Sequence, residues 1–373
     1  MDIRLRPAFL AGTLTPPPSK SLQHRYIIAE WLANGKSRIT PASEDAERTE
    51  NAVRQLFAGG GTVDCGASGT TLRLLMPLAA VMGAEATFTG TPRLLARPLG
   101  RAVPYERTEA GLRLLPCPFP EEITVKTEQT SQELSGWLFA LPLLPDDRRI
   151  RLAGETVSHP YIEMTRSVLR EYGIVSEKTE TGFFVPGGQT YTAPSKTPVI
   201  EADASAAAFF LVANAHGAEI DVRGLAPNSR QGDADIAAYL ASFPSKVCLA
   251  DTPDLFPPLA LHAALQAGRR TAFFGLARLR NKESDRVRGV TEILTAFGVE
   301  TNLAGDTLTV VGREKLRGGD VSASDDHRLA MTAAIAAAFA EGETLLHGAE
   351  TVGKSYPAFW EDYRRIGGVY EEV

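Results

Sequence analysis

The sequence predicts a two-domain α/β protein in which each domain consists of three repeated units with buried helices. Two observations support this fold class. One pattern of polar, apolar and turn-forming residues occurs six times, and the 373 residues suffice for two to three domains at roughly 150 residues per domain. Apolar residues make up 44% and charged residues 23% of the chain, which is typical of a globular protein.

Each copy of the pattern begins with small or acidic polar residues and continues into an Ala- and Leu-rich apolar stretch. A break of Gly, Asn or Asp then precedes a short run of β-forming residues. This order is typical of an N-capped buried helix, a tight turn and a strand. An α/β protein without repeats also contains capped helices followed by strands, and that alternative stays open. The copies begin near residues 19, 68, 130, 203, 252 and 325.

The elements follow in order from the six copies. Buried helices are expected around residues 26–29, 72–81, 137–144, 209–213, 255–265 and 329–340. Strands are expected at residues 37–40, 86–89, 149–152, 219–222, 271–274 and 344–346. Polar, amphipathic helices are expected at residues 45–57, 160–172, 233–243, 283–297 and 357–366. After the second copy, Pro98 and Pro104 leave room for little helix.

The repeat also predicts the domain boundaries. Three copies form a first domain of residues 16–203, and three form a second domain of residues 1–15 plus 204–373. The opening residues 3–15 are β-like, and we expect them to cross over and complete the second domain.

Composition excludes several classes of function. The 39 Lys and Arg residues against 45 Asp and Glu residues give a charge of −6, which argues against a general nucleic-acid binder. Cys65, Cys117 and Cys248 are too few and too scattered for a disulfide framework or a metal site. The N-terminus lacks the order of a signal peptide, and the longest apolar runs are shorter than the ~20 residues that span a bilayer. We expect a cytoplasmic protein without membrane or nucleic-acid partners.

Cations gather at the predicted starts of helices. Such starts present unpaired backbone N–H groups and a positive dipole end, so several of them facing one cleft would bind a polyanion. For any single cation, a solvated surface position is the alternative. Their recurrence at equivalent positions favours an anion-binding cleft. The cations are Lys20, Arg25, Arg73, Arg97, Lys282, Arg286, Arg328 and Lys354.

Three stretches of the chain resemble motifs of the EPSP synthase (3-phosphoshikimate 1-carboxyvinyltransferase) family. Residues 18–25 (PSKSLQHR) resemble its P-x-S-K-S opening, residues 282–286 (KESDR) its K-E-(T/S)-D-R segment, and residues 326–331 (DHRLAM) its D-H-R-x-A-M segment. Weaker matches occur in the family's order at residues 68–73, 97–98, 130–132, 158–162, 228–233, 253–254 and 354–357. The resemblance covers essentially the whole chain.

The resemblance implies a two-domain enolpyruvyl transferase-like fold with three βαβαββ-type units per domain and buried parallel helices, an inside-out α/β arrangement. It implies transfer of the enolpyruvyl group of phosphoenolpyruvate to the 5-hydroxyl of shikimate 3-phosphate, with release of phosphate, in the shikimate pathway of aromatic amino-acid biosynthesis. Both substrates carry a phosphate and a carboxylate, which fits the cations. No metal or cofactor is implied, because cations can stabilise the developing charge. Family analogy implies a monomer.

The resemblance also implies roles for individual residues. The catalytic residues would be Asp254, Glu283, Lys282 and Lys20, since the reaction needs a base for the hydroxyl and an acid for the methylene carbon. Shikimate 3-phosphate would contact Lys20, Ser21, Arg25, Thr130, Ser131, Gln132, Ser158, Tyr161, Asp254 and Lys282. Phosphoenolpyruvate would contact Lys20, Gly69, Arg97, Gln132, Arg286, His327, Arg328 and Lys354, where guanidinium forks suit its carboxylate and phosphate.

Some of these residues have a structural alternative. Asp254 is also a good helix N-cap, and His327 could be a cap that faces the core. Asp285 is expected to be an ion-pair partner. Asp203 and Ser205 are expected mainly to cap the helix at the crossover between the domains.

The chain departs from the family pattern in three respects. Ala67 stands where the family has Asn, Arg278 where many members have Asn or Glu, and Thr130 where the first Ser is usual. The chain is also shorter than typical members, with cuts at residues 59–65, 100–122 and 243–251. A weakened or non-catalytic homologue that binds shikimate-type anions is therefore an alternative. UDP-N-acetylglucosamine enolpyruvyl transferase is a second one, but Pro92 occupies the position of its reactive cysteine.

Overall fold

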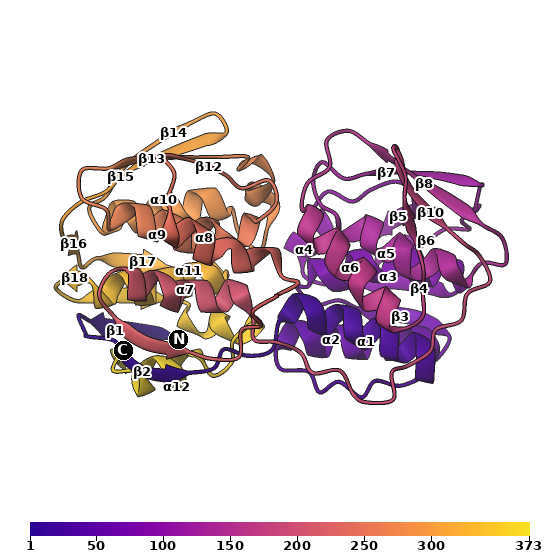
Figure 1. Cartoon of the computed structure of the whole chain (residues 1–373), viewed down its shortest axis with the longest axis horizontal. Coiled ribbons are helices and arrows are strands. Elements are labelled where there is room, and N and C mark those ends of the chain that lie inside the picture. Colours follow the sequence, from indigo (N-terminus) through magenta and orange to yellow (C-terminus); the bar gives the residue numbers. More distant parts are fainter. The chain divides into compact units, whose positions relative to one another are not determined.

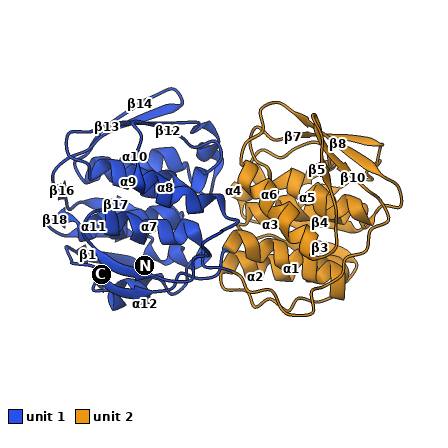
Figure 2. Cartoon of the chain, viewed as in Figure 1, with its two compact units in different colours: residues 1–19, 201–373 blue, residues 20–200 orange.

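The computed structural model describes residues 1–373 and divides into two compact units (Figure 2). Unit 1 comprises Met1–Ser19 and Glu201–Val373, and unit 2 comprises Lys20–Ile200. Both units are mixtures of helices and strands (Figure 1). No helix has the length and apolarity required to cross a membrane.

Unit 2 contains six α-helices, one 3₁₀ helix and eight strands. The helices are α1 (Lys20–Asn34), α2 (Glu44–Phe57), α3 (Gly69–Val81), α4 (Pro92–Ala96), α5 (Gln132–Ala140), η1 (Leu141–Leu143) and α6 (His159–Glu171). The strands are β3 (Gly60–Asp64), β4 (Glu85–Thr89), β5 (Tyr105–Thr108), β6 (Gly111–Leu114), β7 (Glu122–Lys126), β8 (Arg148–Ala153), β9 (Glu177–Lys178) and β10 (Gly182–Val185). They form two four-stranded sheets, β3-β4-β6-β5 and β7-β8-β10-β9.

Unit 1 contains the remaining elements. Its helices are α7 (Ala204–Ala215), η2 (Gly232–Asp235), α8 (Ile236–Ala241), η3 (Pro253–Leu255), α9 (Phe256–Ala264), η4 (Ala277–Asn281), α10 (Arg286–Ala296), α11 (His327–Ala338), η5 (Ala349–Lys354) and α12 (Phe359–Arg365). Its strands are β1 (Asp2–Arg6), β2 (Ala11–Leu14), β11 (Glu219–Val222), β12 (Lys246–Cys248), β13 (Arg270–Phe274), β14 (Glu300–Ala304), β15 (Thr307–Val311), β16 (Leu316–Arg317), β17 (Asp320–Ser322), β18 (Ala340–Glu341), β19 (Thr344–His347) and β20 (Val369–Glu372). Four-stranded sheets have the orders β12-β13-β15-β14 and β17-β19-β1-β20.

All four four-stranded sheets share one pairing pattern. In each, the first two strands are parallel and the two following pairs are antiparallel. A helix joins each parallel pair as a crossover, for example α3 between β3 and β4, because parallel strands cannot be joined by a tight turn. In the last sheet the third position belongs to β1, so the N-terminal strand completes unit 1.

The helices fall into two classes by burial. In α11 all twelve residues are buried, and in α1 residues 22–31 are buried on every side, as expected of helices in the middle of a core. The helix α2 instead buries Ala46, Thr49, Ala52, Val53 and Leu56 along one face. The apolar repeats therefore correspond to core helices, and the polar segments to outer ones.

One predicted strand is wrong. Residues 37–40 form no strand, because side chains satisfy the polar backbone groups that a neighbouring strand would otherwise bond. Buried Glu30 accepts from the backbone N–H and the guanidinium of Arg38, and Gln23 donates to the carbonyl of Thr40. The segment predicted at residues 233–243 is divided into η2 and a short α8.

The close contact between α3 and α5 allows a test of how tightly the core of unit 2 is packed. A Cβ at Gly136 would lie 2.7 Å from the carbonyl oxygen of Arg73 and 2.8 Å from that of Leu74, both backbone atoms of α3. We expect G136A to lower the free energy of unfolding by about 2 kcal/mol, since overpacking against backbone outweighs the helix propensity of Ala. Urea unfolding measures this loss.

The matched control is G289A in α10. There the new Cβ would meet only the side chain of Leu329, which can change rotamer. A loss for G136A no larger than that for G289A would contradict this account of the α3–α5 contact.

Candidate active site

In unit 1, a buried cluster of ion pairs forms around Arg286 at the start of α10. The guanidinium donates to Asp254 Oδ1 at 2.7 Å, to Glu283 Oε2 at 2.7 Å and to Asp326 Oδ2 at 3.0 Å. Arg286 is only 1% exposed. Burial alone would lower its pKa, but the three carboxylates, Asp326 first, raise it instead. Arg286 is therefore a permanent cation, and it holds the predicted residues Asp254 and Glu283 together.

Asp254, in η3, carries a negative charge in this cluster. Its second oxygen accepts from Arg328 Nη2 at 2.7 Å. Burial alone would raise the pKa of Asp254, but Arg328, Lys282 and Arg286 outweigh burial and hold this pKa well below its ordinary value. Because Arg286 and Arg328 hold its two oxygen atoms, the carboxylate of Asp254 has a fixed orientation as a hydrogen-bond acceptor.

Lys282 has a lowered pKa. Burial lowers it to about 8, while nearby Asp254 opposes the shift. A lysine that titrates near neutral pH can both hold and release a proton at the pH of the cell. Lys282 and Glu283 are adjacent in the chain, just before α10, so the predicted proton-handling pair lies beside Asp254.

The start of α11 places His327 and Arg328 next to the same cluster. Asp326 caps the helix by accepting from the backbone N–H of Arg328 at 3.0 Å, and it also accepts from Ser284. His327 is the first helical residue and is buried. Asp326 was not among the predicted site residues, although its position before His327 and Arg328 marks it as an N-cap.

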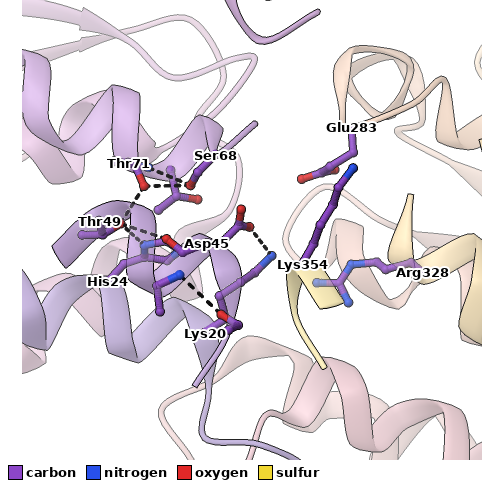
Figure 3. A network of polar contacts seen from close by, with 12 residues as sticks. Lys20, His24, Asp45, Thr49, Ser68, Thr71, Glu283, Arg328 and Lys354 are labelled. Atoms are coloured by element: carbon purple, nitrogen blue, oxygen red, sulfur yellow. Dashed lines mark hydrogen bonds and ion pairs between the residues drawn. The ribbon is translucent and has the colours of Figure 1, made fainter. Parts of the chain in front are cut away.

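Lys354 lies at the end of η5, and Figure 3 shows its side chain together with those of Glu283 and Arg328. Its ammonium donates to the carbonyl and the carboxylate of Asp325 at 2.7 and 2.6 Å. Asp325 and Ser324 have positive φ values of 62° and 46°, which non-glycine residues adopt rarely. Lys354 therefore helps to hold the turn that precedes α11.

A second acid in unit 1 was missed by sequence reasoning. Asp233 is buried and accepts from the hydroxyl of Ser205. Burial, together with the charge of Asp254, raises the pKa of Asp233 to about 7. The sequence placed Asp233 in a motif of the family, but only its burial shows that its charge state is sensitive to pH.

In unit 2, Arg25 is a buried cation without a carboxylate partner. Its guanidinium donates to Thr165 Oγ1 at 2.8 Å and to the carbonyls of Ser21 and Tyr161 at 2.7 and 3.1 Å. The side chain is 1% exposed, and burial lowers its pKa to about 10. An uncompensated buried charge is unfavourable, so this position is suited to a bound anion. The hydrogen bonds of Arg25 connect it to Ser21 and Tyr161, so three of the residues predicted to contact shikimate 3-phosphate lie together.

Gly69, at the start of α3, lies beside two more arginines. A Cβ at Gly69 would come within 2.6 Å of Arg73 Nη1 and 2.8 Å of Arg97 Nη1, so a larger residue would displace the ends of both arginine side chains. Arg97 is 7% exposed, and its Nε has no hydrogen-bond partner. Arg73 donates to Gln132 Oε1 at 3.2 Å. The starts of α3 and α5 and the end of α4 thus bring Gly69, Gln132 and Arg97 together.

The remaining predicted residues of unit 2 lie at helix starts. Ser131 is the buried N-cap residue of α5, and Thr130 accepts from the backbone N–H of Gln132 at 3.2 Å. Ser158 precedes α6 with a left-handed φ of 59°. Lys20, the first residue of α1, donates to Asp45 at 2.8 Å (Figure 3). Asp45 was not predicted to have a role.

A buried chain of hydrogen bonds runs from His24, in the same helix as Lys20, through the hydroxyl groups of three residues (Figure 3). His24 Nδ1 is 2.5 Å from Thr49 Oγ1, which is 2.6 Å from Thr71 Oγ1. Thr71 donates to Ser68 Oγ at 2.8 Å. Each hydroxyl has one proton, so the proton of Thr49 goes to Thr71 or, at 3.4 Å, to the carbonyl of Asp45, and in either case Thr49 accepts from His24. The chain therefore fixes the tautomer with the proton on Nδ1, and it ties α1 and α2 to the start of α3.

Two buried groups of cations thus occur, one per unit. Lys20, Arg286 and Arg328 lie at helix starts, whereas Arg97 follows α4 and Lys354 ends η5. In unit 1 the cations share carboxylates that could accept and release protons, and in unit 2 two arginines have no carboxylate partner. This fold and these groups define an α/β enzyme for small anionic substrates.

Comparisons with known proteins agree with this class. The family model for EPSP synthase (3-phosphoshikimate 1-carboxyvinyltransferase) matches residues 58–243 and 236–363. A 3-phosphoshikimate 1-carboxyvinyltransferase of Clostridium kluyveri is 36% identical over 423 aligned residues, which cover 99% of this chain and 98% of the relative. That of Clostridioides difficile is 31% identical and covers 100% of this chain and 98% of the relative. This chain belongs to the EPSP synthase family.

The solved structure of an EPSP synthase from Acinetobacter baumannii has the same fold. It superposes with a TM-score of 0.77 at 22% sequence identity and covers 100% of both chains. The predicted fold class and the resemblance stated from the motifs are confirmed. In the alignment with the Clostridium kluyveri protein, at least 50 of the 423 positions are gaps in this 373-residue chain.

The His24 chain of hydrogen bonds gives a test with a matched pair of variants. In H24N the amide nitrogen takes the place of Nδ1, whereas in H24Q it takes the place of Nε2, where no partner exists. We expect H24Q to lower the free energy of unfolding by about 1–3 kcal/mol, the cost of a lost buried hydrogen bond, and H24N to lose less. Denaturant unfolding measures both.

Nitrogen NMR of the wild-type protein is an independent check. Burial, with Lys20 and Arg25 nearby, holds the pKa of His24 well below its usual value. The Nδ1–H tautomer should therefore persist below about pH 6.5, where a free histidine becomes protonated. An Nε2–H signal at neutral pH would refute the assigned direction of the chain.

Proposed function

We infer that this chain transfers the enolpyruvyl group of phosphoenolpyruvate to the 5-hydroxyl of shikimate 3-phosphate and releases phosphate, as a transferase of the shikimate pathway. The observation that supports this most strongly is the pair of buried arginines, Arg25 and Arg97, which have no carboxylate partner in unit 2. Substrates with a phosphate and a carboxylate supply the charges that these guanidinium groups lack.

Unit 2 is proposed to hold most of shikimate 3-phosphate. Arg25 and Ser21 at α1 and Tyr161 at α6 form one connected group. Hydroxyl and amide groups suit the phosphate and the ring hydroxyls, and the Tyr161 ring can pack on the cyclohexene face. The starts of α5 and α6 supply Thr130, Ser131, Gln132 and Ser158.

Phosphoenolpyruvate is proposed to contact cations from both parts of the chain. Gly69 lets its carboxylate or phosphate approach the backbone of α3, whose N–H groups and dipole favour an anion. Arg97 would supply a bidentate fork to the same ligand. The further contacts proposed are Lys20 and Gln132 of unit 2 and Arg286, His327, Arg328 and Lys354 of unit 1.

The chemical step is assigned to the cluster around Arg286. Asp254 is ionised and held in a fixed direction, which suits it to accept the proton of the 5-hydroxyl. Glu283 and Lys282 would protonate the methylene carbon of phosphoenolpyruvate, and the pKa of Lys282 near 8 allows it to exchange protons at neutral pH. The surrounding guanidinium groups can stabilise negative charge in the transition state.

The proposal includes the two domains predicted from the sequence. The first domain, residues 16–203, would provide the shikimate 3-phosphate side, and the second would provide the acid–base groups. We also propose that the protein acts as a cytoplasmic monomer. A non-catalytic anion binder is the alternative that the shortened segments suggest, and the full-length match to the family does not favour it.

A phosphate-release assay with shikimate 3-phosphate and phosphoenolpyruvate decides between these candidates. Pure, folded protein should release phosphate only when both substrates are present. A protein that binds shikimate 3-phosphate by calorimetry but releases no phosphate above background would be the non-catalytic binder.

Substitution of Asp254 tests its assignment to the chemical step. D254A and D254N should lower kcat at least about 100-fold, because a positioned base contributes that much, while shikimate 3-phosphate still binds. D235N, at an exposed aspartate of unit 1, is the control and should keep full turnover. If D254N bound no shikimate 3-phosphate, Asp254 would be a ligand-binding residue rather than a base.

A further inference from the structure

Arg278 lies in η4 and is 7% exposed. Its Nη2 donates to the carbonyl of Leu249 at 3.0 Å and also to the carbonyl of Ala250. Nothing in the expected reaction assigns a contact of this kind to the residue. The arginine thus joins two segments of unit 1 that are nearly 30 residues apart in the sequence.

Both segments lead directly to residues of the proposed chemical step. Ala250 follows β12 and is four residues before Asp254, while Arg278 itself is four residues before Lys282. The segment between β12 and η3 has no regular secondary structure. Buried carbonyl groups in such a segment need a donor, and a guanidinium group provides charge-assisted bonds of fixed direction.

We propose that Arg278 is a positioning residue that ties the Asp254 segment to the Lys282 segment and so sets the geometry of the catalytic pair. It acts through these two residues and touches no reacting atom itself. The proposal deepens the proposed function and rests on it for its kinetic readout.

The charge of Arg278 has a second consequence. The groups that face Lys282 are Asp254 from η3, its neighbour Glu283, Arg286 from α10 and Arg278 from η4. Burial lowers the pKa of Lys282 most, and Arg278 lowers it further. Loss of this cation should therefore raise the pKa of Lys282, whereas a lysine at position 278 should leave it nearly unchanged.

Three variants distinguish the positioning role of Arg278 from the effect of its charge. R278Q removes the cation and the long side chain whose Nη2 makes both bonds, and R278K keeps the charge with a single ammonium group. R280Q is the matched control, because Arg280 lies in the same η4 but is only half-buried, donates to the carbonyl of Gly305 at 3.3 Å and pairs with Asp285 at 3.6 Å. Thermal unfolding of each variant verifies that it is folded.

We expect R278Q to lower kcat about tenfold or more through misplacement of the pair, and to shift the Lys282 limb of the pH profile upward. R278K should lower kcat less and keep that limb in place, and R280Q should match the wild type in both. A folded R278Q with wild-type kcat and an unshifted limb would overturn the proposal.

A readout without turnover distinguishes this proposal from the proposed function. Competitive labelling with acetic anhydride across pH, read by mass spectrometry, reports the pKa of Lys282 in the ligand-free protein. If the wild type releases no phosphate, the proposed function fails. An upward shift in R278Q, absent in R280Q, would then still support the link between Arg278 and Lys282, and no shift would refute it.

Discussion

A helix that is buried on every side can take part in polar chemistry only at its ends. This constraint governs both units, because α1, α3 and α5 in unit 2 and α7, α9 and α11 in unit 1 fill the cores. Their first backbone N–H groups have no partner within the helix, and the positive dipole end favours an anion there. Caps supply some of these partners, as Asp326 does for α11. Some of the residues assigned to substrates lie at these starts, as Lys20, Gly69 and His327 do, while others lie at the ends of outer helices.

The two units solve the problem of buried charge in different ways. In unit 1, Arg286 pairs with three carboxylates and Arg328 pairs with one of them, Asp254, so the cations are neutralised within the protein. In unit 2, Arg25 contacts only neutral oxygen atoms, which leaves its charge unbalanced until an anion binds. A buried charge without a partner destabilises the fold, so it is retained where binding gains from it. Under the proposed function the carboxylates of unit 1 would serve a different purpose, since they would take part in proton transfer and not balance a bound anion.

Much of the fold could be predicted from the sequence because the core helices differ from their surroundings in composition. Stretches such as residues 329–340 are typical of a buried helix between a cap and a turn, and α11 occupies most of this one. The failure at residues 37–40 has a physical cause: the buried carboxylate of Glu30, in the preceding helix, binds the guanidinium and the backbone N–H of Arg38, and the pattern of apolar and polar residues does not report such a contact. The same applies to the site. Motifs indicated Arg286 and Lys282, but the shared carboxylate of Asp326 and the contacts of Arg278 depend on packing.

The shortness of the chain is compatible with a complete site because of where the short elements lie. Helix α4 has five residues and buries only Leu94, and α8 has six and buries only Ile236, so both contribute little to the cores. A core helix cannot be truncated without opening a cavity, which costs several kcal/mol, whereas an outer helix can. Before Asp254, the side chain of Arg278 supplies hydrogen bonds to the carbonyls of Leu249 and Ala250. A single long side chain can thus hold a segment that has no regular secondary structure, since the carbonyls need a donor and not a particular fold around them.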